Sequence, residues 1–331
     1  PPCHGGMFRA AARRSGPLAR EWVRSPDAVA GAELRVMHFN VLADCLARSA
    51  PLFGTKRGFR CSPEALSWEH RSELLRQELT RHGCDIVSLC EVDRYDDFFE
   101  PELARHGYGG TFKRKRSPAK DGVAVFWRRS RWEDGLQRAV YLERGGRRTP
   151  AQQVALLQRL RLAPSHCQDG GGAARSVVVC ATHLRSKADE ALRMQQASEV
   201  VSALADFSRG DERIIMADIN SDAPSDSGIG GSASSIFEYF QACGYRCAYR
   251  TVGAARNRYA SGGDSSRFPD YTTWAGWASG DFRAVCDHIF VSSGIHVSAV
   301  LDVPQADALA AAFPERLPND AFPSDHMSLV A

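Results

Sequence analysis

The stretch at residues 213–222, RIIMADINSD, constrains the fold of this chain more than any other part of its sequence. Its run of three apolar residues is typical of a short strand that is buried on both faces. Asp218 and Asn220 stand two residues apart, so an extended backbone projects both side chains to one face. Polar groups at the end of a buried strand either cap the next turn or carry chemistry, and this stretch alone does not separate the two.

The same arrangement recurs along the chain. Short apolar runs end at carboxylate, amide or imidazole side chains, and segments with helical spacing lie between several of these runs. The residues at the expected strand ends are Asn40, Glu91, His183, Asp218, Asn220, Asp287, Asp325 and His326. Each of them alone is more often structural, but an ordered set at successive strand ends indicates a catalytic centre.

Strands and helices alternate without an internal repeat or a linker, which predicts a single α/β domain over residues 33–331. The content of 44% hydrophobic and 24% charged residues is ordinary for a soluble globular protein. The net charge of +3 is too small to indicate a nucleic-acid partner, so any basic site must be local. No apolar run approaches the ~20 residues that a membrane span needs, so we expect no membrane association.

Residues 1–32 form a basic segment that we expect to lie outside the folded domain. Between residues 7 and 25, five arginines (positions 9, 13, 14, 20 and 24) stand against one acidic residue, Glu21. This composition is typical of an organelle transit peptide and predicts a mitochondrial location. A disordered basic tail on a cytoplasmic protein is the alternative. The start at Pro1 and the stop inside an expected strand at residue 331 suggest a fragment.

The ten cysteines contain no C-x-x-C pair, which argues against a structural zinc site. Most of them stand in apolar runs, where a free thiol packs as a small hydrophobe, and this usage fits a reducing compartment. Cys90 directly precedes Glu91, so oxidation of its thiol is a candidate means of controlling the site.

Carboxylates, amides and histidines that meet in one cleft make a hard-oxygen metal site with an acid–base partner. Mg²⁺, or in its place Mn²⁺, suits such ligands. A phosphate ester is the natural substrate, because its negative charge repels an attacking hydroxide unless a cation offsets it. A histidine near its ordinary pKa of ~6.5 can serve as a base or as a donor to the phosphate.

A series of motifs in a fixed order carries a resemblance to a known family. The motifs are Phe39-Asn40, Glu91-Val-Asp93, Thr182-His-Leu184, Asp218 with Asn220, Tyr271 to Trp274, Asp287 to Phe290 and Ser324 to His326. The chain resembles the deadenylase-related branch of the endonuclease/exonuclease/phosphatase superfamily, and within it the nocturnin-like enzymes. The resemblance implies a DNase I-like, four-layer α/β sandwich, in which two mostly antiparallel or mixed β-sheets lie between helices.

The resemblance also implies a role for each residue. It places magnesium at Glu91, with Asn40 and Asp287 near it. Asp218 and Asn220 position the attacking water and the phosphate. His183 and His326 contact the phosphoryl oxygens, and Asp325 orients His326. The cations expected around the substrate phosphates are Lys115, Arg185 and Lys187.

Three departures from the family pattern leave these positions in place. Cys90 stands where the family has Gln, Ala217-Asp-Ile-Asn220 replaces Gly-Asp-Phe-Asn, and Asp287-His288 replaces Asp-Tyr. Because a thiol is a weaker hydrogen-bonding group than an amide, Cys90 alters the support of the metal-binding Glu91.

The nocturnin-like resemblance implies removal of the 2′-phosphate from NADP(H), which gives NAD(H). Shortening of poly(A) RNA is the alternative, and a catalytically inactive binding module is a third hypothesis. An RNA exonuclease needs aromatic platforms and an extended basic track, whereas here the basic residues cluster at two places. The retained metal ligands argue against the inactive module. We therefore expect a small charged substrate.

Overall fold

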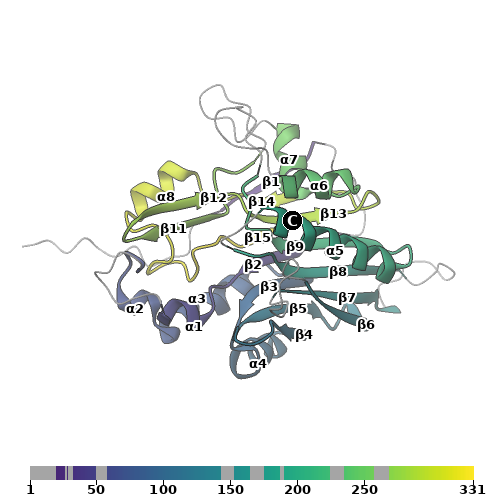
Figure 1. Ribbon diagram of the computed structural model, residues 1–331, viewed down its shortest axis with the longest axis horizontal. Helices are drawn as coiled ribbons and strands as arrows, with labels where there is room; N and C mark the ends of the chain where they lie inside the picture. The colour runs from purple at the N-terminus through teal and green to yellow at the C-terminus, as the bar shows by residue number, and fades with distance from the viewer. Residues whose placement is uncertain are drawn as a thin grey trace, which may run out of the picture.

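The computed structural model describes residues 20–26, 28, 33–49, 58–142, 153–164, 175–186, 190–223, 235–256 and 268–331 (Figure 1). Two mixed β-sheets pack face to face, and helices lie outside them. This is the four-layer α/β sandwich that the family resemblance implied. Among the described helices, none combines the length and the apolar character that a membrane crossing requires.

One sheet has five strands in the order β15-β2-β3-β5-β4. β2 and β3 are parallel, and the other neighbours are antiparallel. The strands are β2 (Val36–Asn40), β3 (Ile86–Val92), β4 (Tyr108–Arg114), β5 (Gly122–Arg128) and β15 (Leu329–Val330).

The other sheet has six strands in the order β10-β13-β9-β8-β7-β6. Here β8 and β9 form the parallel pair, and the remaining neighbours are antiparallel. The strands are β6 (Trp132–Tyr141), β7 (Val154–Leu162), β8 (Ser176–His183), β9 (Glu212–Asp218), β10 (Arg246–Cys247) and β13 (Asp287–Val291). Each sheet thus contains one parallel pair, and each pair ends at residues of the predicted site.

Two small antiparallel pairs complete the strands. β1 (Trp22–Arg24) pairs with β14 (Ala299–Leu301), and β11 (Thr273–Trp277) forms a hairpin with β12 (Gly280–Ala284). The hairpin lies beside α8 (Ala306–Ala312), away from the helices that cover the six-stranded sheet (Figure 1).

The helices arise where the sequence has caps and helical spacing. Ser62 caps α2 (Pro63–Leu66) and Ser67 caps α3 (Trp68–Arg81), so this helical segment is divided in two at Ser67. α5 (Glu190–Ser208) packs on the six-stranded sheet. The remaining helices are α1 (Asp44–Ser49), the π-helix η1 (Tyr95–Phe99), α4 (Glu100–Arg105), α6 (Ser235–Ala242) and α7 (Ala248–Arg256).

The folded domain begins before residue 33, where we had placed its boundary. Val23 of β1 is fully buried in the core. The Arg20 guanidinium is also buried, and it donates to Ser328 Oγ at 2.7 Å and to Glu78 Oε1 at 3.4 Å. The predicted boundary is wrong because strand pairing and these buried contacts hold residues 20–25 to the domain. Residues 1–19, with most of the expected targeting segment, lie outside the described residues.

Candidate active site

The two parallel strand pairs bring their carboxyl ends to one place between the sheets. Asn40 ends β2 of the five-stranded sheet, and Asp218 ends β9 of the six-stranded sheet. The Asn40 amide nitrogen Nδ2 donates to Asp218 Oδ2 at 3.0 Å and to Glu91 Oε1 at 3.3 Å. One buried amide therefore joins the two sheets, and the predicted convergence of these three residues is seen in the structure.

Glu91 owes its position to an irregularity in β3. The register with β5 shifts between Cys90 and Val92, and Glu91 has a φ of +58°. A bulge of this kind turns one side chain out of the regular alternation, at a cost in backbone strain for a residue other than glycine. The Glu91 carboxylate accepts from the Ala43 N–H at 3.2 Å. Burial raises the pKa of this carboxyl to about 7, and the nearby ammonium of Lys115 opposes the rise.

Asp218 stands at the middle of the cluster. Its Oδ1 accepts from the Asn220 N–H at 3.0 Å, and its Oδ2 lies 3.6 Å from His183 Nε2 and 3.9 Å from His326 Nε2. Burial, followed by the neighbouring Asp287 carboxylate, raises the pKa of Asp218. One carboxylate oxygen thus faces two imidazoles from opposite parts of the chain.

Asp287 begins β13, directly opposite Asp218 in the β9–β13 register. Its Oδ1 is 3.2 Å from His38 Nε2, and its Oδ2 is 2.8 Å from His326 Nδ1. Thr272 Oγ1 also donates to Oδ2, at 2.8 Å. Both oxygens are thus occupied on a side chain with no exposed surface. We expected Asp287 beside the metal, but its contacts make it the residue that holds two histidine rings.

His326 is oriented by Asp287 and not, as we predicted, by its neighbour Asp325. An aspartate side chain accepts only, so the imidazole Nδ1 carries the proton of that hydrogen bond and Nε2 faces Asp218. Burial disfavours the charged imidazole, but the Asp287 carboxylate raises the pKa of His326 well above its ordinary value. The main-chain carbonyl of Asp325 accepts from Trp274 N–H and Thr273 Oγ1.

His183 ends β8 and, unlike His326, is neutral. Burial, followed by the ammonium of Lys115, lowers the pKa of His183 well below its ordinary value. Lys115 Nζ lies 3.5 Å from His183 Nδ1 and donates to Asp121 Oδ2 at 2.6 Å. Because an ammonium only donates, Nδ1 of this neutral ring accepts, and its Nε2 proton points at Asp218.

Three further predicted residues are less central. Asn220 has a φ of +49° and donates from Nδ2 to the Leu184 carbonyl at 3.0 Å, so this contact uses one N–H of its amide. Arg185 follows β8 and is half-buried, and its backbone N–H donates to Gln196 Oε1 at 3.0 Å. Lys187 lies outside the described residues. The expected cation set around the phosphates therefore rests on Lys115 and Arg185.

The model of the Endonuclease/Exonuclease/phosphatase family matches residues 37–326 of the chain, from β2 to His326.

The chain belongs to the endonuclease/exonuclease/phosphatase family.

Similar members of this family are known from animals. Nocturnin from Homo sapiens is 30% identical over 312 residues, which cover 90% of this chain and 64% of that protein. The 2′,5′-phosphodiesterase 12 from Rattus norvegicus is 27% identical over 326 residues, or 90% of this chain and 51% of that protein. The chain therefore spans less than two thirds of the length of these two relatives.

Solved structures of the family have the same fold. The human Nocturnin catalytic domain, determined with a bound sulfate anion, has a TM-score of 0.65 and 25% identity, covering 94% of this chain and 95% of that one. ANGEL2, described as a 2′,3′-cyclic phosphatase, has a TM-score of 0.73 and covers 96% of this chain and 98% of that one. Its 19% identity supports the fold alone.

Enzymes of the endonuclease/exonuclease/phosphatase family generally depend on a divalent metal ion, and the residues present here fit one. Glu91 offers carboxylate oxygens, and the Asp325 carboxylate is close enough to raise the pKa of Glu91 further. Asn40 faces Glu91 with its Nδ2, because its Oδ1 accepts from the Leu42 N–H at 3.2 Å. Oxygen donors with room for water are the ligands of Mg²⁺. A divalent cation would also offset the cost of keeping the buried Glu91 carboxylate ionised.

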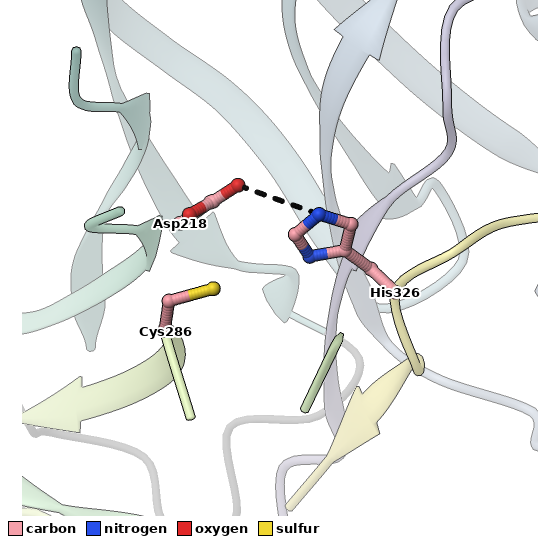
Figure 2. A group of neighbouring side chains, drawn as sticks. All are labelled: Asp218, Cys286 and His326. Atoms are coloured by element: carbon pink, nitrogen blue, oxygen red, sulfur yellow. Dashed lines mark ion pairs between the residues drawn. The ribbon is translucent and has the colours of Figure 1, made fainter. Parts of the chain in front are cut away.

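Cys286 is a member of the centre that sequence reasoning missed. Its sulfur forms a buried group with Asp218 and His326, in which the potential ligand atoms all lie within 4.8 Å of one another (Figure 2). In Figure 2 the three side chains point toward a common space, from β9, from the residue before β13 and from the segment before β15. Burial raises the pKa of the Cys286 thiol well above its ordinary value.

His38, Thr272 and Asp121 were also missed. Each contacts a predicted residue: His38 and Thr272 contact Asp287, from 249 and 15 positions away, and Asp121 contacts Lys115, six positions before it. His38 directly precedes the motif Phe39-Asn40, and Thr272 lies within the motif Tyr271 to Trp274. This proximity to the family motifs is the signal by which the sequence could have indicated these two residues.

The surroundings of Cys90 do not favour oxidation of its thiol. Its side chain is buried in the core, and its sulfur donates to the Thr182 carbonyl at 3.2 Å. Burial raises the pKa of the thiol well above its ordinary value, so the reactive thiolate is scarce. The structure therefore argues against Cys90 as a redox control of the site.

Proposed function

We propose that this member of the family is a Mg²⁺-dependent phosphohydrolase that removes the 2′-phosphate from NADP(H) and leaves NAD(H). The observation that carries the proposal is the buried ammonium of Lys115, 3.5 Å from His183 Nδ1 at the edge of the Asp218–His326 centre. A phosphate monoester carries more negative charge than the diester linkage of RNA. A buried cation at the edge of a centre that also holds the protonated His326 ring suits the more highly charged group.

Asp218 is the residue that we assign to the attacking water. Its Oδ2 is the meeting point of Asn40, His183 and His326. A carboxylate in that position can accept a hydrogen bond from water and align it with the phosphorus atom. Asn40 holds the carboxylate in place from the other sheet, because its amide donates to the same oxygen.

His326 supplies positive charge to the phosphoryl oxygens. Its Nδ1 proton is donated to Asp287, so a protonated ring presents Nε2–H toward the substrate side. A preorganised donor of this kind stabilises the charge that develops on the oxygens as the ester bond breaks. His183 is neutral and serves as a hydrogen-bond donor without adding charge.

The divalent ion, held by Glu91 with Asn40 and Asp325 near it, would polarise a phosphoryl oxygen of the bound substrate. The Glu91 carboxyl, whose pKa is raised to about 7, must be ionised to bind it. The bulge that turns Glu91 out of β3 is thus a requirement of the site.

Removal of poly(A) is the second candidate, because the same catalytic residues can hydrolyse a diester. Single-stranded RNA is usually held by stacking of successive bases on exposed aromatic rings. In the described part of the chain, the only large aromatic side chains that are exposed are Trp22 on β1 and Phe282 on β12. The scarcity of such rings supports the small substrate.

The test places the purified chain with Mg²⁺ against NADP⁺, NADPH and a poly(A)-tailed RNA in parallel. Released phosphate and RNA length are measured, with Glu91→Ala as the control for contaminating enzymes. Phosphate from NADP⁺ or NADPH with intact RNA supports the proposal. Shortened RNA without free phosphate assigns the chain to the poly(A) nucleases and refutes the dinucleotide assignment.

A further inference from the structure

We propose that Cys286 gives this centre a second, soft cation site, which takes Zn²⁺ through Asp218, Cys286 and His326 and thereby inhibits the enzyme. The binding of zinc follows from the three side chains alone. The inhibition rests on the proposed hydrolase function, because the ion would occupy two residues that the reaction needs.

The side chains already form most of a zinc site. The three potential ligand atoms lie within 4.8 Å of one another, and Asp218 Oδ2 is 3.9 Å from His326 Nε2. Zinc bonds of 2.0–2.3 Å in a tetrahedron place two ligand atoms about 3.3–3.8 Å apart. A contraction of about 1 Å, which small side-chain rotations supply, therefore brings all three atoms within bonding distance.

The backbone fixes the sulfur beside the carboxylate. Asp287 is the register partner of Asp218, so Cys286 lies next to the end of β9. The Ile219 N–H donates to the Cys286 carbonyl at 2.8 Å, and the Cys286 N–H donates to Thr272 Oγ1 at 3.0 Å. These main-chain bonds hold Cys286 on both sides, which limits the reorganisation that metal binding requires.

Asp287 prepares His326 as a zinc ligand. Zinc-bound histidines commonly donate their second ring N–H to a carboxylate, which fixes the tautomer and leaves the other nitrogen for the metal. Here Nδ1 donates to Asp287 at 2.8 Å, and Nε2 is the nitrogen that faces Asp218. The carboxylate–histidine half of this arrangement is thus already present without a metal.

The ligand types separate this site from the one for the hard ion. Mg²⁺ prefers oxygen and water, which Glu91 and its neighbours provide, whereas thiolate and imidazole favour Zn²⁺. Binding forms bonds from zinc to the Asp218 oxygen, the Cys286 sulfur and His326 Nε2. The thiol proton and the Nε2 proton leave to solvent, so two protons are released for each ion bound.

A binding experiment tests the site directly. Co²⁺ replaces zinc as the probe, because a cobalt–thiolate bond gives a charge-transfer absorption in the near ultraviolet. Zn²⁺ affinity is measured by competition with a chromophoric chelator. Wild type is compared with Cys286→Ser and with the matched control Cys90→Ser, whose thiol is buried elsewhere in the same sheet sandwich.

The expected result is a thiolate band in wild type and in Cys90→Ser that is absent from Cys286→Ser. Zn²⁺ affinity falls by about 10-fold or more in Cys286→Ser, in line with the loss of one metal ligand. Equal Zn²⁺ affinity in all three proteins, or no thiolate band in wild type, overturns the proposal. Circular dichroism confirms that each variant is folded, and Cys286→Ala serves if the serine variant is not.

An activity experiment tests the inhibition. Each protein is titrated with Zn²⁺ at a saturating concentration of Mg²⁺, and its activity is expressed relative to its own zinc-free value. Wild type and Cys90→Ser are inhibited at about 10-fold lower free Zn²⁺ than Cys286→Ser, and a chelator restores the activity. Inhibition at the same Zn²⁺ concentration in all three proteins contradicts inhibition through Cys286.

The two experiments together separate the metal site from the proposed function. A cobalt band without turnover of any substrate refutes the proposed function and supports the metal site. Turnover without the band supports the proposed function and refutes the metal site.

Discussion

His326 Nδ1 lies 2.8 Å from Oδ2 of Asp287, a residue 39 positions earlier in the chain, and not against the adjacent Asp325. The two residues come from different elements, the start of β13 and the segment before β15. The hydrogen bond orients the His326 ring, and the Asp287 carboxylate raises its pKa. The role that we propose for His326 in the reaction depends on both effects.

The first prediction concerns that pair. Asp287→Asn removes the charge that favours the imidazolium, so the pKa of His326 falls toward its ordinary value. The rate constant kcat decreases by about 10²- to 10⁴-fold, with a smaller change in KM. NMR titration of the His326 ring in wild type and variant measures the pKa, and steady-state kinetics measures kcat. An unchanged pKa of the His326 ring in Asp287→Asn would contradict the role of Asp287 in raising it. Asp325→Asn is the control for the loss of a nearby negative charge.

The second prediction concerns Lys115. Lys115→Met keeps much of the side-chain volume and removes the charge that faces His183, so kcat/KM for the proposed substrate NADP(H) falls by about 10- to 10³-fold. Lys113→Met is the matched control, because this residue is on β4 and its ammonium lies over the Tyr141 ring at 5.7 Å. Asp121→Asn weakens the hold on Lys115 and gives a smaller loss. Equal losses in Lys113→Met and Lys115→Met would show that general positive charge, and not this contact, is required.

The third prediction concerns the amino-terminal boundary. A chain that begins at residue 20 keeps β1 and Arg20, whereas a chain that begins at residue 33 loses both. The shorter chain buries one valine fewer and leaves the Glu78 carboxylate without its Arg20 partner. Removing one partner of a buried ion pair costs about 3–5 kcal/mol when the remaining charge is left unpaired. Glu78 keeps Arg81, whose guanidinium lies 2.8 Å from Oε2, so the free energy of unfolding falls by less than that amount. Urea denaturation of the two chains measures it, and equal midpoints would restore the boundary to residue 33.

The fourth prediction follows from the pKa of Glu78. Burial alone would raise it, but His82, Arg20, Arg81 and Ser328 together lower it to about 2. The unfolded chain binds this proton near pH 4.3, so the stabilisation is complete above that pH and is lost as the pH falls toward 2. The contribution is on the order of 3 kcal/mol.

Glu78→Gln removes the proton-linked part of this stabilisation. Its free energy of unfolding depends less on pH between about 5 and 2 than that of wild type. Glu73→Gln on the exposed face of α3 is the control, since Glu73 accepts from Arg76 and Gln77 of the same helix. Identical acid denaturation of wild type and Glu78→Gln would show that the carboxylate is not held in this way.

The sequence predicted the centre where local pattern is enough. Asn40, Glu91, His183 and Asp218 each follow an apolar run, and pairing of parallel strands brings such ends to one edge. The four-layer sandwich and its mixed sheets were expected from the family resemblance. The strand ends are visible in the sequence itself, whereas the order of the strands in each sheet came only with the resemblance.

What the sequence did not predict depends on contacts between distant residues. The role of Asp287 follows from its register with Asp218 and from His38, 249 positions away. Cys286 looked like another buried thiol, because nothing in its neighbourhood shows that the sulfur faces a catalytic carboxylate. Arg20 looked like part of a basic tail, yet burial against Ser328 makes it a core residue. Tertiary packing overrode composition at each of these positions.

The placement of one parallel pair in each sheet has a mechanical consequence. Asn40 and Glu91 belong to one sheet, while His183 and Asp218 belong to the other, and the hydrogen bond between Asn40 and Asp218 spans the junction. Neither half of the sandwich carries a complete reaction centre. Catalytic activity therefore depends on the contact between the two sheets. A small displacement of one sheet relative to the other would abolish activity while the strands of both sheets remained folded.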